Sequence, residues 1–262
     1  YLGCGTALWV GQQIDSSDQL FYTNKDAFIA KGADVHMQTN VDHVDFEAKK
    51  VHYVDSENRE TVIDYDQLIL ATGSLPITPK LPGMDLGGVH FVKLFQDSQK
   101  VDALLSQEHV KNVVVVGAGY IGVEMAEAAR RRGKNVRIVE SASTCLSSYY
   151  DEWFSKDMDK VMSDQGIDLN YGEMVTAFEG DGNVSKVVTA KGSYDAELVI
   201  MAIGFRPNNE LGKNDLKLFN NGAYLVDLQQ RTSLPDVYAV GDCATLYSNA
   251  LQETTYIALA TN

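Results

Sequence analysis

One stretch of the sequence decides the fold: it reads NVVVVGAGYIG and occupies residues 112–122. The β-branched run in its first half is typical of a parallel strand that is buried on both faces. Three glycines, Gly117, Gly119 and Gly122, follow at once and lead into a helical segment that Gly133 ends. A strand, a glycine-rich turn and a helix in this order predict the first part of a βαβ unit.

The next strand, expected over 136–140, completes the unit and ends on the acidic residue Glu140. In a dinucleotide site, Gly117 would make the tight turn, Gly119 would let the backbone approach a pyrophosphate, and Gly122 would let the helix pack on the strand. Glu140 would bind the adenosine ribose hydroxyls and repel a 2′-phosphate, which favours NADH over NADPH. The alternative is a glycine-rich turn in an unrelated α/β domain, and the surrounding strand, helix and acidic residue favour the dinucleotide.

Composition narrows the class of protein. The 262 residues are 45% hydrophobic, enough for one large domain or two ordinary ones. A net charge of −14 argues against binding to nucleic acid or anionic membranes, and no apolar run reaches the roughly 20 residues of a membrane span. The three cysteines are far apart, which predicts neither a disulfide framework nor a zinc site and fits a cytoplasmic location.

Further strands and a linker extend the α/β pattern. Short β-prone segments are expected over 35–38, 41–46, 51–54 and 61–64, and buried strands over 68–71, 198–203 and 237–240. Thr23 and Asp26 resemble a capping box for a short helix. The proline- and glycine-rich residues 76–88 predict a loop.

Two other residues are candidates for chemistry, each with a structural alternative. Cys4 lies at an expected helix start, where the dipole and unpaired N–H groups favour a reactive thiolate; from the residues alone, the favoured interpretation is a small buried side chain. Asp242 follows a buried strand, where a carboxylate can bind ligand hydroxyls, although Gly-Asp is also a common turn. The five histidines show no metal-ligand spacing, so no metal is expected.

Six segments in order resemble one known family: LGCG (2–5), LATG (70–73), VVGAGYIGVE (115–124), AIGFRPN (202–208), YAVGDC (238–243) and IALATN (257–262). They are similar to the NADH oxidase and NADH peroxidase branch of the FAD-dependent pyridine nucleotide-disulfide reductases. The resemblance covers the whole chain. Dithiol members of the family place a second cysteine five positions after the first, where this chain has Trp9.

The resemblance implies an α/β fold with two doubly wound nucleotide-binding domains, each with a small antiparallel β element. The FAD-binding domain would comprise 1–110 and 232–262, with a NAD-binding domain over 111–231 inserted into it. By this resemblance, the sequence is expected to be truncated at both ends, without the family's N-terminal FAD fingerprint and its C-terminal dimerisation domain. The full-length protein is expected to be a homodimer.

The resemblance also implies roles for single residues in redox chemistry. Cys4 would be the redox cysteine that alternates between thiolate and sulfenic acid, and this reading replaces that of a buried side chain. Tyr120 would cover the flavin face where nicotinamide enters, with Ile121 beside it. Glu124 would lie near the flavin and nicotinamide rings.

The remaining residues implied by the resemblance bind cofactor. Thr72 and Gly73 would lie along FAD, and Asp242 would bind its ribityl hydroxyls. Gly204 belongs to the same cofactor-binding set. The residues expected near the pyrimidine side of the flavin are Ala258, Leu259 and Ala260.

The expected activity is that of a water-forming NADH oxidase with the cofactors FAD and NADH. Its small-molecule substrate would be O2, and Cys4 would keep peroxide from escaping. The nearest alternative is an NADH peroxidase that reduces H2O2, followed by a coenzyme A disulfide reductase. A module that binds NADH without catalysis is the alternative from a different class.

Overall fold

The computed structural model describes residues 1–256 of the chain. The chain divides into two compact units: unit 1 comprises Tyr1–Thr23 and Pro76–Gly204, and unit 2 comprises Asn24–Leu75 and Phe205–Asn262. The assignment of 1–110 and 232–262 to FAD, and of 111–231 to NAD, stays a prediction.

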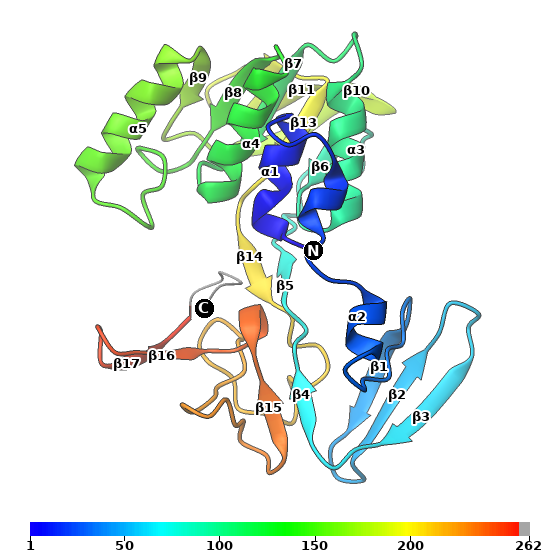
Figure 1. Ribbon diagram of the computed structural model, residues 1–262. Helices are drawn as coiled ribbons and strands as arrows, with labels where there is room; N and C mark the ends of the chain where they lie inside the picture. The colour runs from blue at the N-terminus through cyan, green and yellow to red at the C-terminus, as the bar shows by residue number, and fades with distance from the viewer. Residues whose placement is uncertain (257–262) are drawn as a thin grey trace. The chain divides into compact units, whose positions relative to one another are not determined.

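Unit 1 is built around a parallel sheet of five strands in the order β6-β13-β7-β8-β9 (Figure 1). Its strands are β6 (Val89–Phe91), β7 (Asn112–Val116), β8 (Asn135–Val139), β9 (Ile167–Asn170) and β13 (Leu198–Met201). The central strands are buried, as their unbroken apolar sequence predicts. The predicted βαβ unit is therefore confirmed, with β7 and β8 paired in parallel.

Alternate residues of β7 enter two separate cores because successive side chains of a strand point to opposite faces. Val113 and Val115 pack against the helical layer, whereas Val114 and Val116 pack against a second, antiparallel sheet. Figure 1 shows the helices on one side of the parallel sheet. They are α1 (Thr6–Val10), α3 (Phe95–Leu105), α4 (Tyr120–Arg131) and α5 (Glu152–Asp164); the antiparallel strands are β10 (Val175–Asp181), β11 (Asn183–Thr189) and β12 (Ser193–Asp195).

Unit 2 is mainly β-structure. An antiparallel meander and three strand pairs form it, and the parallel pair of β4 with β15 joins segments that are far apart in the sequence. The elements are α2 (Lys25–Ile29), β1 (Asn40–Asp45), β2 (Lys50–Val54), β3 (Glu60–Asp64), β4 (Leu68–Leu70), β5 (Ser74–Pro76), β14 (Phe205–Pro207), β15 (Val237–Ala239), β16 (Leu246–Ser248) and β17 (Glu253–Thr255). A small core that includes Leu70, Tyr224 and Ala239 supports the β4–β15 pair.

Three local predictions are wrong. No strand forms over 35–38. Helix α2 is capped by Asn24 rather than Thr23, because the Asn24 side-chain oxygen accepts a hydrogen bond of 3.0 Å from the Ala27 N–H. Strand β4 is not buried throughout, since Ile69 is 63% exposed.

Candidate functional site

The glycine loop, residues 117–122, joins the end of β7 to the start of α4. Gly117 has a φ of +104°, and its N–H donates to the Val139 carbonyl oxygen at 2.8 Å. A Cβ added to Gly117 would lie 2.4 Å from the Ala202 carbonyl oxygen, and one added to Gly122 would lie 2.0 Å from the Gly117 carbonyl oxygen. The tight turn and the close helix–strand packing predicted for these two glycines are therefore both present.

The middle glycine of the loop, Gly119, faces open space. It is the N-cap of the twelve-residue helix α4, and no side chain among the described residues caps the helix there. A Cβ added to Gly119 would meet only the ring of Tyr149, at 3.9 Å. The first turn of α4 combines open N–H groups with the positive end of the helix dipole, so this end of the helix can receive a phosphate group.

Glu140 follows β8, and main-chain groups hold its carboxylate in place. The Ala118 N–H donates to Oε2 at 2.7 Å, and the Ala142 N–H donates to Oε1 at 2.8 Å. Glu140, Gly119 and Gly204 line the same cavity of about 500 Å³. A fixed carboxylate beside a loop that can receive phosphate suits a ribose next to a pyrophosphate.

Tyr120 opens α4 next to Ile121 and is surrounded by two further tyrosines. Its ring centroid lies 4.4 Å from that of Tyr149, and its hydroxyl donates to the Tyr150 hydroxyl at 3.1 Å. Donation to Tyr150, followed by burial, raises the pKa of Tyr120 to about 12. Tyr120 is therefore a neutral hydrogen-bond donor at ordinary pH.

Glu124 lies one turn after Tyr120 on α4 and lines a groove of about 1140 Å³ between α4 and α5. Desolvation of its carboxyl group, followed by the charge of Glu127, raises the pKa of Glu124 above its ordinary value. The groove wall also includes the exposed apolar residues Phe154 and Val161 of α5.

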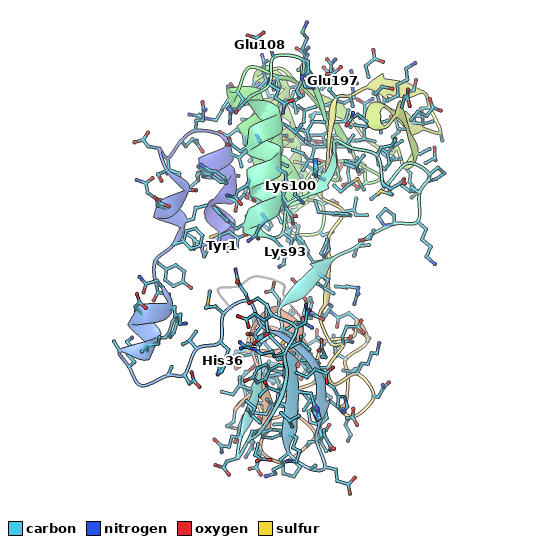
Figure 2. The ribbon with its side chains drawn as sticks, turned by 90° about the vertical axis from the view of Figure 1, so that its right-hand side faces the viewer. Tyr1, His36, Lys93, Lys100, Glu108 and Glu197 are labelled. Atoms are coloured by element: carbon cyan, nitrogen blue, oxygen red, sulfur yellow. The ribbon has the colours of Figure 1, made fainter. Side chains whose placement is uncertain are left out.

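Cys4 carries the accessible thiol of the chain. It lies in the short turn that precedes α1 and is exposed, whereas Cys145 and Cys243 are buried. Burial, followed by the neighbouring carboxylate of Asp159, raises the pKa of the Cys145 thiol to about 12, so that thiol stays protonated. The segment before Cys4 is anchored by the Tyr1 hydroxyl, which donates at 2.9 Å to the carbonyl oxygen of Lys93; Figure 2 labels both residues.

In unit 2, polar groups gather where the parallel strands β4 and β15 end. The Ser74 hydroxyl donates to Oδ2 of Asp242 at 2.8 Å. The Thr72 hydroxyl donates to the Asn208 carbonyl oxygen at 2.5 Å, and the Asn208 N–H donates to the carbonyl oxygen of Gly73, whose φ is +69°. Ligands of α/β sheets bind at the carboxyl ends of parallel strands, and a held carboxylate there suits a ligand rich in hydroxyl groups.

The predicted site residues thus fall into two groups. Unit 1 holds Cys4, Gly117, Gly119, Tyr120, Ile121, Gly122, Glu124, Glu140 and Gly204, and unit 2 holds Thr72, Gly73 and Asp242. Gly204 has a φ of +103°, and its carbonyl oxygen accepts a hydrogen bond of 3.0 Å from the Ile77 N–H. The predicted residues Ala258, Leu259 and Ala260 lie outside the described part of the chain.

Sequence reasoning missed several residues that shape these sites. Tyr149 and Tyr150 surround Tyr120, and the available signal was the adjacent aromatic pair after the βαβ unit. Glu173 is 4% exposed and lines the same cavity as Glu140. It accepts a hydrogen bond of 2.8 Å from the Tyr194 hydroxyl, and its N–H donates at 3.0 Å to the Glu140 carbonyl oxygen. Nothing in the local sequence distinguishes Glu173 from a surface glutamate.

Residues 1–256 contain neither a metal-binding cluster nor a helix that could span a membrane. In that part of the chain, no group of three or more His, Cys, Asp and Glu side chains is placed to hold a metal ion. The helices described there are all too short or too polar to cross a membrane.

The chain is similar to known proteins over its whole length. A profile of the family described as pyridine nucleotide-disulphide oxidoreductase matches residues 1–262. An NADH oxidase of Lactococcus lactis is 53% identical over 264 residues, which span all of this chain and 59% of that protein. An NADH oxidase of Streptococcus pyogenes is 47% identical over 274 residues, or 60% of its length.

A solved structure of an NADH oxidase has the same fold as this chain. The water-forming NADH oxidase from Lactobacillus brevis, bound to NADH, superimposes with a TM-score of 0.96 and 35% sequence identity. The match covers all of this chain and 58% of that one. The chain therefore spans about three-fifths of the length of the relatives it matches.

Proposed function

Because the chain belongs to the pyridine nucleotide-disulphide oxidoreductase family, we propose that it forms part of an FAD-dependent NADH oxidase that reduces O2 to water. The observation that carries this proposal is the exposed thiol of Cys4, in the unit that also contains the glycine loop and Glu140. The NADH oxidases among the relatives support an NADH oxidase activity. The exposed thiol of Cys4 supports water as the product.

NADH would bind to unit 1 through the groups around the cavity of about 500 Å³. The pyrophosphate would lie at Gly119 and the start of α4, and the adenosine ribose hydroxyls would donate to the Glu140 carboxylate. Glu140 would also exclude the 2′-phosphate of NADPH by charge repulsion. The nicotinamide would then reach the region of Tyr120, with Ile121 and Glu124 nearby.

FAD would be held in part by unit 2, whose residues fit a flavin in one respect. Its ribityl chain carries hydroxyl groups, and Asp242 offers a carboxylate that Ser74 already orients at 2.8 Å. Thr72 and Gly73 would border the same ligand from the end of β4. When bound, FAD supplies the two-electron transfer between NADH and the second substrate.

The redox cycle of Cys4 is proposed to complete the reduction of O2. One NADH reduces O2 to the level of hydrogen peroxide. The thiolate sulfur of Cys4 attacks one peroxide oxygen, the O–O bond breaks, and the products are a sulfenic acid and hydroxide. A second NADH reduces the sulfenic acid to the thiolate and water. Of the two protons consumed, one joins O2 as the peroxide forms and the other converts the hydroxide to water. The sum is two NADH, two protons and one O2 giving two NAD⁺ and two water molecules. The two buried cysteines are unsuited to this role because peroxide cannot reach them.

A Cys4→Ser substitution tests the proposed function in the flavin-loaded protein. Hydride transfer does not require the thiol, so NADH oxidation should continue while H2O2 accumulates in place of water. Cys243→Ser is the matched control, because that thiol is buried, and it should still give water. If the Cys4→Ser variant forms only water, Cys4 has no part in the reaction. If wild-type protein oxidises NADH only after H2O2 is added, the protein is a peroxidase, and a purified protein without flavin absorbance would favour a binding module.

A domain assignment follows from the same proposal. FAD would bind to 1–110 and 232–262, and NADH to 111–231, with the full-length protein a homodimer. The glycine loop and Glu140 fall within 111–231, which supports NADH binding there. Thr72 and Gly73 fall within 1–110, and Asp242 falls within 232–262, which supports FAD binding to those segments.

A further inference from the structure

Three tyrosines meet at the start of α4, where the proposed nicotinamide path ends. Tyr149 lies between the nucleotide cavity, which it lines, and the ring of Tyr120. Tyr150 lines the groove between α4 and α5 together with Tyr120, and the two rings meet edge-on with their centroids 6.1 Å apart. Among residues 1–256, a hydrogen bond within this group of rings joins the hydroxyls of Tyr120 and Tyr150 at 3.1 Å.

We propose that Tyr150 is a positioning residue: its hydroxyl holds the ring of Tyr120 across the nicotinamide path, so that the nicotinamide enters only when the two hydroxyls separate. The inference rests on the proposed function, because it takes NADH as the ligand and Tyr120 as the residue that yields. It adds a role for Tyr150 that neither the sequence pattern nor the family resemblance supplied.

The segment that carries Tyr150 is fixed to the glycine loop. The Leu146 N–H donates to the Ala118 carbonyl oxygen at 2.8 Å. The N–H groups of Tyr149 and Tyr150 both donate to the Leu146 carbonyl oxygen, at 2.9 and 3.1 Å. The backbone of Tyr150 is therefore held relative to the glycine loop by main-chain hydrogen bonds, and from this position its hydroxyl accepts the hydrogen bond from Tyr120.

The chemistry of the pair favours a closed but weakly held arrangement. Tyr120 stays protonated, and so remains a donor, because donation to Tyr150 and burial raise its pKa to about 12. The pair is exposed to water, which can replace either partner when the ring moves. A single neutral hydrogen bond of this kind changes an equilibrium by about twofold to tenfold. The binding of a substrate can therefore offset the loss of this hydrogen bond, and the loss is still large enough to measure as a change in affinity.

A comparison of two ligands distinguishes the movement of Tyr120 from nucleotide binding in general. ADP-ribose has the adenosine and pyrophosphate groups of NAD⁺ but lacks nicotinamide, so it binds without movement of Tyr120. NAD⁺ carries the nicotinamide, so its binding requires Tyr120 to move. Both affinities are measured by calorimetry on the flavin-loaded protein, for wild type and for Tyr150→Phe, which keeps the ring and removes the hydroxyl. The expected result is that NAD⁺ binds about twofold to tenfold more tightly to the variant while ADP-ribose affinity is unchanged.

Tyr22→Phe is the control, because Tyr22 is an exposed tyrosine that lines neither the nucleotide cavity nor the groove between α4 and α5, and it should leave the ratio of the two affinities at its wild-type value. An unchanged ratio in Tyr150→Phe would overturn the proposal. It would also be overturned if Tyr22→Phe changed the ratio as much as Tyr150→Phe does. Failure of wild-type protein to bind ADP-ribose would instead contradict the proposed nucleotide site, which is a separate outcome.

Discussion

The carboxylate of Glu140 accepts a hydrogen bond of 2.7 Å from the main-chain N–H of Ala118, in the middle of the glycine loop. One side chain therefore connects the end of β8 to the loop that would receive the pyrophosphate. The same carboxylate lines the nucleotide cavity. Under the proposed function, both the choice of nucleotide and the geometry of the loop depend on Glu140, and a substitution there should affect both.

Replacing Glu140 with Ala should weaken discrimination between NADH and NADPH. Removal of the negative charge abolishes the repulsion of a 2′-phosphate, while loss of the acceptor costs ribose hydrogen bonds. The ratio of kcat/KM for NADH to that for NADPH should fall by roughly tenfold or more. Steady-state kinetics with both nucleotides measures this ratio, and an unchanged value would show that Glu140 does not set the preference.

A Glu140→Gln variant separates charge from hydrogen bonding. The amide oxygen can still accept the hydrogen bond from the Ala118 N–H, so the loop should keep its geometry, whereas the amide nitrogen cannot accept the one from the Ala142 N–H. The ratio of kcat/KM values should nevertheless fall, because the charge is gone. If the glutamine variant discriminates as well as wild type and only the alanine variant fails, hydrogen bonding rather than charge determines the preference.

Substitution by alanine at two glycines of the loop should affect two different properties, the stability of the fold at Gly117 and ligand binding at Gly119. At Gly117 it would combine a φ of +104° with a Cβ 2.4 Å from a carbonyl oxygen, which should destabilise the fold by roughly 2 to 4 kcal/mol. At Gly119 the nearest atom is 3.9 Å away, so the fold should tolerate the methyl group while ADP-ribose binding is lost. Urea unfolding and calorimetry measure the two properties. Normal ADP-ribose binding by Gly119→Ala would contradict the placement of the pyrophosphate.

Glu173 should make stability depend on pH. Burial raises the pKa of its carboxyl group, but hydrogen bonds from Thr189, Tyr194 and Asn170 outweigh burial and lower the pKa below the ordinary value of 4.5. The ionised carboxylate therefore stabilises the fold above about pH 4.5, and this stabilisation is lost as the pH falls through the lowered pKa. Glu173→Gln should lower the free energy of unfolding at pH 7 by about 1 to 3 kcal/mol, and by less in acid.

Urea unfolding at pH 7 and at a pH well below 4.5 tests this dependence. Glu179→Gln, at an exposed position of β10, serves as the control and should change the free energy of unfolding by less than about 0.5 kcal/mol at either pH. A difference between wild type and Glu173→Gln that is the same at both pH values would mean that the Glu173 carboxylate does not carry the effect.

Asp242 and Ser74 should differ in their effect on flavin content. Asp242→Ala removes the carboxylate that would bind the ribityl hydroxyls, so the protein should purify with little FAD. Ser74→Ala removes only the donor 2.8 Å from that carboxylate, and a partial loss of FAD is expected. Absorbance of the bound flavin relative to protein measures both. Full flavin content in Asp242→Ala would remove Asp242 from the cofactor site.

The parts of the fold that could be predicted are those governed by local rules. A run of valines followed by glycines specifies a buried strand and a tight turn whatever lies around it, and β7 with the Gly117 turn was predicted correctly. Segment 35–38 has strand-forming residues, yet a strand also needs a pairing partner, which local sequence does not reveal. Helix α3 was missed, although the Asp97 carboxylate caps it by accepting the Leu94 N–H at 2.9 Å.

The candidate site divides in the same way. The glycine loop and Glu140 could be predicted from the sequence because their spacing is fixed by one βαβ unit. The contact of Ser74 with Asp242 could not be predicted, because 168 positions separate the two residues. Tyr150 reaches Tyr120 only through the loop that Leu146 attaches to Ala118, and that loop has no sequence signature of its own.

The ratio of NADH consumed to O2 consumed, measured with an oxygen electrode on the flavin-loaded protein, tests the central claim most directly. Reduction of O2 to water needs four electrons, so the account predicts about two NADH per O2 and no oxygen released when catalase is then added. A ratio of about one, with half of the oxygen returned by catalase, would mean that peroxide is the final product and would contradict the proposed cycle of Cys4.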